Sequence, residues 1–191
     1  MVIVAVIIGL LGGFGAVGIQ FSIKFFQKIF WGDWQANVAY LESLPVWMKI
    51  GVPTFGGLLV GSIVHFFAKE AKGHGVPEVM EAIALRNGII RPRVVFAKLF
   101  ASAICIGSGG SVGREGPVIQ IGSSIGSTVA QFLRVTAERV KVFVACGAAA
   151  GIAAAFNAPI AGALFSVEII LGDFGVANFS PIVISSVMAT V

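Results

Sequence analysis

Arg114 and Glu115 are the charged residues whose surroundings in this sequence most clearly point to chemistry. They lie in the stretch GSGGSVGREGP, from Gly107 to Pro117, and uncharged runs at 99–113 and 116–133 flank them. Ionisable groups at membrane depth are energetically costly and mark ion or proton pathways. If the chain is a membrane protein, the pair therefore marks a candidate pathway.

The residues around this pair form a glycine-rich turn that opens onto the start of a helix. Pro117 suits the first helical turn, where a missing N–H does no harm, and the preceding glycines let the backbone present its N–H groups to a ligand. Such a helix N-terminus attracts anions. We therefore predict an anion site in which the Glu115 carboxylate competes with the anion. The other residues of this predicted site are Gly113, Arg114, Gly116 and Pro117.

A second segment, Gly73-His74-Gly75-Val76-Pro77, has the same order of a glycine turn followed by proline. Alone, either segment would indicate no more than a capped helix start. Together, in a membrane protein, they offer two helix N-termini to one anion, because partial positive ends and desolvated N–H groups both favour negative charge. We therefore predict that these five residues form a second wall of the anion site.

The composition places the chain in a membrane. Of its 191 residues, 57% are hydrophobic and 12% are charged, whereas soluble domains carry about 25% charged residues. The formal net charge of +4 resides in links between apolar runs, so it indicates membrane topology rather than nucleic-acid binding. We predict an all-α, polytopic membrane protein in which residues 1–191 form a single transmembrane domain. A chain that begins and ends within apolar runs is also expected to be cut at both ends.

Apolar runs predict where the membrane helices lie. The runs are residues 1–23, 50–68, 94–113, 116–133, 142–167 and 180–191. Asn157 and Pro159 break the run 142–167, so we predict two helices that meet there. Broken helices of this kind point to the binding site of a transporter. Glycines four residues apart, which allow close helix contact, occur at 57/61, 122/126 and 147/151.

The links between these runs predict the orientation. The basic links at 69–98 and 134–141 hold nine Lys and Arg residues, whereas the link at 24–49 holds three. By the positive-inside rule the basic links face the cytoplasm. The link at 24–49 also holds all three tryptophans and the single tyrosine, which is typical of an interfacial belt, here on the outer side.

The two glycine-turn segments resemble signature segments of the CLC family of chloride channels and chloride/proton exchangers. GSGGSVGREGP is similar to the long signature of that family, GHGVPE resembles its earlier GSGIPE segment, and FNAPIAGALFSVE, from Phe156 to Glu168, resembles a third. The likeness covers the first half of a CLC subunit, and the family's GxFxP segment and pore tyrosine are absent. It implies tilted and broken helices, the first half of a CLC-type inverted repeat, and a homodimer whose faces are residues 160–170 and 180–191.

By this resemblance Glu115 is the gating glutamate, whose carboxylate occupies an anion site when deprotonated and swings away when protonated. The resemblance thus implies chloride or a similar small anion, protons at Glu115 and a lipid bilayer as the partners, with no cofactor. The competing interpretation of Glu115 is a carboxylate at a helix N-terminus that pairs with Arg114.

Two residues depart from the family's pattern. Position 74 is commonly a serine that helps bind the central anion. His74 could donate through a ring N–H, more strongly when protonated near its ordinary pKa of about 6.5, or could instead turn towards the cytoplasmic vestibule, so the preferred anion stays open. Ile169 aligns with the glutamate that exchangers use as an inner proton relay, and Glu168 lies about 100° away around a helix. With that relay lost, the sequence favours a passive anion channel over an exchanger or a transporter for another anion.

Other classes of function find less support in the sequence. A metal site built from His65, Glu70, His74 and Glu78 has no known ligand spacing, so we predict none. A membrane enzyme that uses His65, His74 and Glu115 lacks a recognised catalytic signature, and we predict no enzyme. A non-transporting membrane fragment stays open, because the family's anion site needs residues from its second half. We expect an integral, multi-pass protein of a bacterial or archaeal cell membrane.

Overall fold

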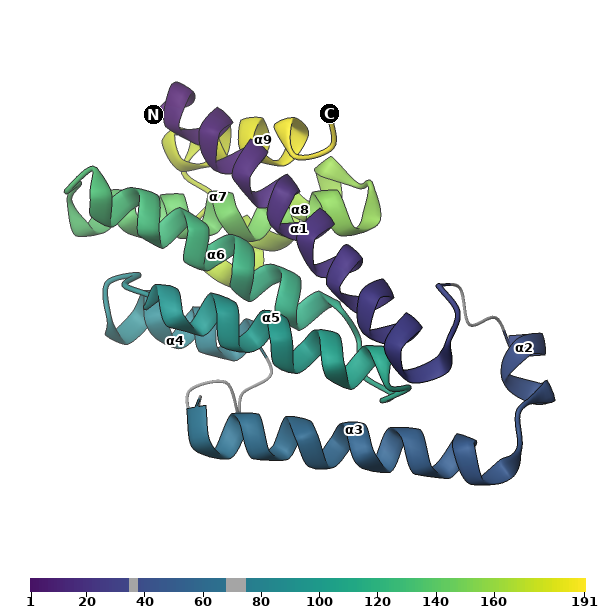
Figure 1. Ribbon diagram of the computed structural model, residues 1–191. Coiled ribbons are helices and arrows are strands. Elements are labelled where there is room, and N and C mark those ends of the chain that lie inside the picture. Colours follow the sequence, from purple (N-terminus) through teal and green to yellow (C-terminus); the bar gives the residue numbers. More distant parts are fainter. Residues whose placement is uncertain (35–37, 68–74) are drawn as a thin grey trace.

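The computed structural model describes the chain except for residues 35–37 and 68–74, and the described part is all-α, as predicted (Figure 1). The helices are α1 (Val2–Trp31), α2 (Val38–Ser43), α3 (Val46–Phe67), α4 (Val76–Leu85), α5 (Pro92–Gly107), α6 (Glu115–Phe132), α7 (Ala137–Phe156), α8 (Pro159–Phe165), the π-helical segment η2 (Ser166–Leu171) and α9 (Val176–Met188).

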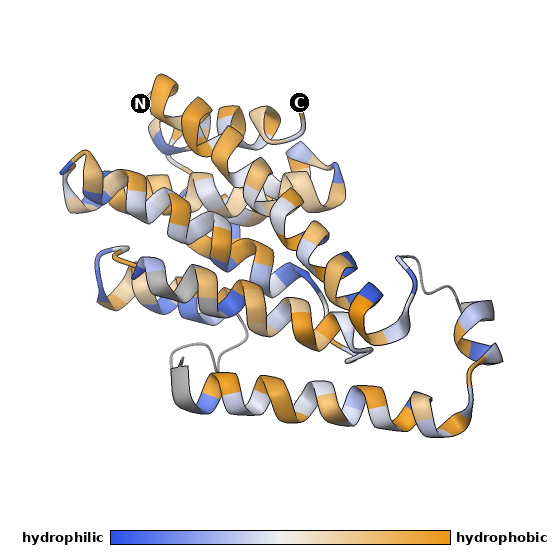
Figure 2. Ribbon diagram, viewed as in Figure 1, coloured by the Kyte–Doolittle hydropathy of each residue, from blue (hydrophilic) through white to orange (hydrophobic). Residues whose placement is uncertain are grey.

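Within the described residues, three helices are long and apolar enough to cross a membrane. They are α1, α3 over Val46–His65, and α7, and shorter apolar helices accompany them. Figure 2 shows hydrophobic residues along most of α1 and of the coloured part of α3. Many of these side chains are exposed in the single chain, among them Phe14, Trp47 and Leu58. Apolar side chains on the outside of long helices are what a lipid environment or further membrane helices would cover.

Helix α7 lies at the centre of the fold, where it packs against α1, α6, α8 and α9 (Figure 1). Nearly every residue from 140 to 155 is buried, and most of them are Ala, Gly or Val. Small side chains let neighbouring helix backbones approach closely, as is common between membrane helices. The buried core therefore lies around a helix that contributes little side-chain volume of its own.

The closest of these approaches joins α6 to α7 through glycine. A β-carbon on Gly122 would collide with the carbonyl oxygen of Gly147, and one on Gly147 would collide with that of Gly122. The next glycines along each helix, Gly126 and Gly151, face the backbone of Phe143 and Val118 in the same way. The prediction that 122/126 and 147/151 mediate helix packing within one chain is confirmed.

The third predicted glycine pair is not used in this way. Gly57 and Gly61 have no atom within 4 Å of the place where a β-carbon would stand, among the described residues. Helix α3 instead packs on α5, and its contact glycine is Gly56, where a β-carbon would collide with the Ser108 hydroxyl. The face of α3 that contacts α5 therefore includes Gly56 and not Gly57, and these two positions lie about 100° apart around the helix.

Helix boundaries differ from the prediction where charged residues continue a helix. Helix α1 does not end at Ile23 but runs through Lys24 and Lys28 to Trp31, where Gly32 adopts a left-handed conformation with φ 79° and donates its N–H to the Lys28 carbonyl oxygen at 2.8 Å. A left-handed glycine is a common helix terminator, because it lacks the steric cost of a β-carbon. Similarly, α7 begins inside the predicted charged link, at Ala137. Helix α9 also begins earlier than the predicted Ser180, at Val176, but through uncharged residues.

The predicted break at Asn157 is confirmed. Helix α7 ends there with Asn157 in the left-handed conformation, at φ 53°, and α8 begins at Pro159. Asparagine is the residue that most often replaces glycine at such a position, and proline suits the first turn of the next helix. The chain reverses at this point and returns along α7 through α8.

Candidate functional site

The starts of α4 and α6 meet backbone to backbone. Gly75, which precedes α4, has φ +87°, and a β-carbon on it would lie 2.5 Å from the carbonyl oxygen of Gly116, the second residue of α6. Pro77 and Pro117 each lie in the first turns of their helices. The first N–H groups of a helix have no intrahelical acceptor and carry partial positive charge. Two such ends therefore lie against one another, as the sequence predicts.

Glu115 is the first residue of α6, and its carboxylate folds back over Gly113. A β-carbon on Gly113 would collide with Oε2 of Glu115, so the missing side chain at this position leaves the room that the carboxylate occupies. Glu115 itself is exposed in this chain. The carboxylate thus lies beside the N-terminus of α6, an end of the helix that carries partial positive charge.

One hollow next to Glu115 lies between α3, α5 and the start of α6. It has a volume of about 360 Å³, and its lining includes Ala101 and three α5 residues with polar or thiol side chains at helical spacing, namely Lys98, Ser102 and Cys105. These residues lie on one face of α5, because positions three or four apart share a face. A cation, a hydroxyl and a thiol therefore face the same space as the Glu115 carboxylate.

A second hollow lies on the other side of the same loop, against α1. It has a volume of about 410 Å³ and is lined by Gln20, Lys24 and Gln27 of α1 together with Arg114 and Glu115.

Three residues line both hollows: Val112, Gly113 and Glu115. Glu115 is the ionisable one among them. A movement of its side chain would therefore change the shape and charge of both hollows together.

Arg114 contacts the end of α7 rather than Glu115. Its Nη2 donates to the carbonyl oxygen of Ala155 at 3.2 Å, and its guanidinium lies 5.8 Å from the centre of the Phe156 ring. No ion pair joins Arg114 to Glu115 in the described part of the chain. Arg114 therefore anchors the start of α6 to the break between α7 and α8, and the competing interpretation of an Arg114–Glu115 pair is not supported.

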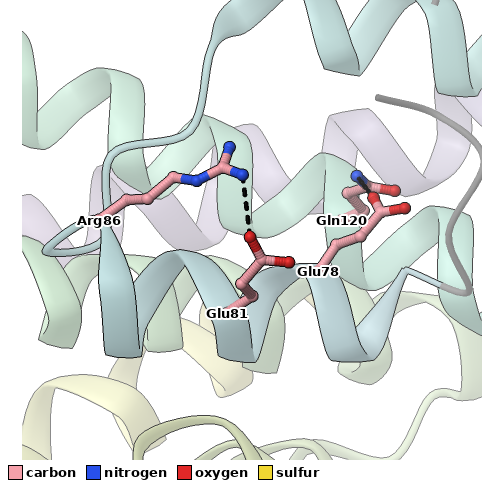
Figure 3. A network of polar contacts seen from close by, with 4 residues as sticks. All are labelled: Glu78, Glu81, Arg86 and Gln120. Carbon is pink, nitrogen blue, oxygen red and sulfur yellow. Dashed lines mark hydrogen bonds and ion pairs between the residues drawn. The ribbon is translucent and has the colours of Figure 1, made fainter. Parts of the chain in front are cut away.

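Sequence reasoning missed a polar network that joins α4, α5 and α6. Figure 3 shows Glu78 and Gln120 turned towards one another; Nε2 of Gln120 donates to Oε2 of Glu78. Lys98 Nζ lies 3.9 Å from Oε1 of Glu78, and its side chain is 8% exposed, against 22% for that of Glu78. A buried lysine requires a counter-charge, and Glu78 supplies it. The signal was available, since Lys98 is the single charge in the run 94–113.

The ion pair drawn in Figure 3, between Glu81 and Arg86, is of a different kind from that of Lys98 and Glu78. Glu81 and Arg86 lie 2.9 Å apart at the C-terminal end of α4, and both side chains are mostly exposed. Exposed pairs contribute little to stability because water and salt screen them. This pair therefore has no structural part in the site around Glu115.

The remaining predicted residues fall in different places. Gly73 and His74 lie outside the described residues, and so does Glu70 of the rejected metal set. His65 is exposed near the C-terminal end of α3. Ile169 lies on η2, where it lines a separate groove of about 1020 Å³ together with Glu168 and Met80. The structure thus brings Gly75 to Pro77 together with Gly113 to Pro117 but does not bring Ile169 to them.

Comparison with known proteins gives concordant matches. The sequence model of the family described as voltage gated chloride channel matches residues 56–191. A ClcB-like protein of Ralstonia nicotianae is 37% identical over 100% of this chain and 46% of its own length. The voltage-gated ClC-type chloride channel ClcB of Citrobacter koseri is 34% identical over 98% of this chain and 45% of its own. The chain therefore spans about half the length of the curated relatives it matches.

Solved structures agree on the fold. A slow cyanobacterial Cl⁻/H⁺ antiporter superposes with a TM-score of 0.79 at 27% identity, over 99% of this chain and 45% of that one. A CLC-type fluoride/proton antiporter gives the same TM-score at 21% identity, also over 99% of this chain and 45% of that one. The second likeness concerns the fold alone.

Proposed function

Because the chain belongs to the voltage-gated chloride channel family, which is the CLC family, we propose that it forms the Glu115-bearing half of an anion pathway. The proposed substrate is chloride or a similar small anion, and the proposed transport is passive. The chain spans about half the length of its relatives. We therefore expect it to act within a full-length unit, by which we mean this chain joined to the second half that its relatives carry.

The observation that carries this proposal is the position of the Glu115 carboxylate. It folds over Gly113 at the N-terminus of α6 and faces both adjoining hollows. A carboxylate and a halide carry the same charge and compete for the same N–H groups. While ionised, Glu115 would occupy the anion's place, and once protonated it would lose the attraction that holds it there. This makes Glu115 the proposed gate.

The start of α4 supports the same proposal from the opposite side. Gly75, Val76 and Pro77 bring a second helix N-terminus against Gly116, and Gly73 and His74 precede them in the chain. Two partial positive ends attract a small anion more strongly than one. We propose that these five residues, with Gly113, Arg114, Gly116 and Pro117, line the anion's path.

A channel is favoured over an exchanger because of Ile169. This side chain lies in the groove beside Glu168, and it has no proton to exchange. The exchanger is kept as a second candidate, since the solved structure at 27% identity is that of a Cl⁻/H⁺ antiporter. Glu168 lines the same groove and is the carboxylate that would have to act in its place.

The exposed apolar surface of the chain suggests which parts contact a second copy and which contact lipid. Ile160 and Leu164 on α8, with Val187 and Val191 at the C-terminal end, leave large apolar side chains exposed. We propose that residues 160–170 and 180–191 form the contact with a second copy, and that lipid covers much of the remaining apolar surface. The expected location is a bacterial or archaeal cell membrane.

The test is anion efflux from liposomes that contain the full-length unit. A chloride gradient drives efflux while a dye reports proton movement. An ionophore holds the membrane potential of the liposomes constant. Under this condition the proposal predicts chloride efflux without stoichiometric proton uptake. Chloride efflux coupled to proton uptake would favour the exchanger, and efflux no faster than from empty liposomes would contradict anion transport itself.

A further inference from the structure

The loop that carries Glu115 begins at the C-terminal end of α5, and this end is closed by a Schellman motif. Gly109 has φ +96°, and its N–H donates to the Ile106 carbonyl oxygen at 3.1 Å, while the N–H of Gly110 donates to the Cys105 carbonyl oxygen at 2.8 Å. The N–H of Ser108 donates to the Ile104 carbonyl oxygen at 2.9 Å. Three of the last four carbonyl groups of α5 thus accept bonds from the loop itself.

The fourth carbonyl, that of Gly107, accepts its bond from a residue far away in the sequence. Nε1 of Trp31 donates to this oxygen at 3.0 Å, across 76 positions of sequence. Trp31 is the last residue of α1 and is 7% exposed, whereas Trp47 is 73% exposed. Within the link that the sequence predicts as an interfacial belt, Trp31 thus differs from Trp47, because its ring is buried against the loop that leads to Glu115.

The Trp31 ring also covers the turn itself. A β-carbon on Gly109 would lie 3.2 Å from Cζ2 of Trp31 and 3.6 Å from Cγ of Pro53 on α3. The loop is therefore held between the ends of α1 and α3, and Glu115 follows Gly109 by six positions. The backbone of Trp31 is held in turn, since the Tyr40 hydroxyl donates to its carbonyl oxygen at 3.0 Å.

We propose that Trp31 is a positioning residue for the Glu115 gate, acting through its indole N–H on the Gly107 carbonyl. This inference rests on the proposed function, in which Glu115 gates the anion path. The bond fixes where α5 ends, and so fixes the start of the short loop that carries the carboxylate. Arg114 fixes the other end of that loop through the Ala155 carbonyl. Residues 111–113, which lie between these two anchors, are exposed, and so is Glu115.

The direct test removes the N–H while keeping the shape of the ring. Trp31 is replaced by 3-benzothienylalanine, in which sulfur stands where the indole has N–H, in the full-length unit in liposomes. Trp31→Phe is the simpler second variant, and Trp47→Phe is the matched control on an exposed tryptophan. Two properties are measured in each: hydrogen exchange of the Gly109 and Gly110 amides, and the pH dependence of anion efflux.

The proposal predicts that the isostere and Trp31→Phe both raise amide exchange at Gly109 and Gly110 by about tenfold, the equilibrium change that corresponds to one lost hydrogen bond. Both also shift the pH at which efflux is half-maximal, and Trp47→Phe changes neither property. Unchanged exchange with the isostere, or raised exchange with an unshifted pH profile, would contradict the proposal. If the unaltered unit shows no efflux, the proposed function fails, and the exchange measurement still decides whether the N–H holds the loop.

Discussion

Gly75 and Gly116 meet through their backbones, so closely that a β-carbon on Gly75 would lie 2.5 Å from the Gly116 carbonyl oxygen. The missing β-carbon at Gly75 is what allows the starts of α4 and α6 to come together. Any other residue at position 75 would also be forced into the positive-φ conformation seen there, at φ +87°. The contact thus joins the two helix N-termini that we propose act together on one anion.

Gly75→Ala is expected to push the two helix starts apart. Backbone strain at positive φ and overpacking together would lower the free energy of unfolding by about 2–5 kcal/mol. Anion efflux should fall at the same time, because the two N-termini no longer face one space. Denaturation of the full-length unit in detergent and efflux from liposomes measure the two effects. The matched control is Gly57→Ala, a helical glycine with open space around it, which should be neutral or slightly stabilising.

Gly122→Ala tests the glycine contact between α6 and α7. The added methyl group would collide with the Gly147 carbonyl oxygen, so the helices must separate along a tightly packed face. We expect a loss of about 1–3 kcal/mol in the free energy of unfolding, as for other overpacked cores. Gly18→Ala on α1 is the control, since nothing lies within 4 Å of its β-carbon position. Equal stability of the two variants would show that the contact does not limit the packing.

Lys98→Met tests the network behind the site. The substitution leaves the Glu78 carboxylate, which is mostly buried, without the cation at 3.9 Å. We expect the free energy of unfolding to fall by about 1–3 kcal/mol. This is less than for a fully buried pair, because water still reaches Glu78. The double variant Lys98→Met/Glu78→Gln removes both charges and should recover part of this loss. If the loss in the double variant equals the sum of the losses in Lys98→Met and Glu78→Gln alone, the two residues do not interact.

Much of the fold could be predicted, because its signals are local. The start of α4, the start of α6 and the break at Asn157 are each encoded by a glycine or asparagine followed by proline, and the structure has all three. The end of α1 was predicted too early. The run of apolar residues ends before Lys24, whereas the helical backbone continues to Trp31 and is terminated by Gly32. Gly32 was the better local signal, because a left-handed glycine ends a helix whatever the polarity around it.

The parts of the site that could not be predicted depend on contacts between distant segments. The bond from Trp31 to Gly107 requires α1 to cross the end of α5, and nothing in either segment encodes that crossing. Likewise, spacing alone cannot say whether Gly56 or Gly57 faces a neighbour, because this depends on the rotation of α3 about its axis. For the same reason, composition could not show that the Trp31 ring is buried whereas the Trp47 ring is exposed.

Arg114→Gln tests the second anchor of the loop. Glutamine is too short to reach the Ala155 carbonyl oxygen that Nη2 of Arg114 contacts at 3.2 Å, and it also loses the contact with the Phe156 ring. We expect a loss of about 0.5–1.5 kcal/mol in the free energy of unfolding and weaker anion efflux. Arg134→Gln, at an exposed turn after α6, is the control. Wild-type stability and efflux in Arg114→Gln would mean that the anchor is dispensable.

The pH profile of anion efflux in Glu115→Gln tests whether Glu115 is the gate. Glutamine keeps the size of the side chain but cannot ionise, so it can neither occupy the anion's place as a charge nor respond to protons. We expect efflux from liposomes containing the unaltered full-length unit to rise as the pH falls and Glu115 becomes protonated. In Glu115→Gln, efflux should stay high and independent of pH. A variant that keeps the pH profile of the unaltered protein would contradict the assignment of Glu115 as the gate.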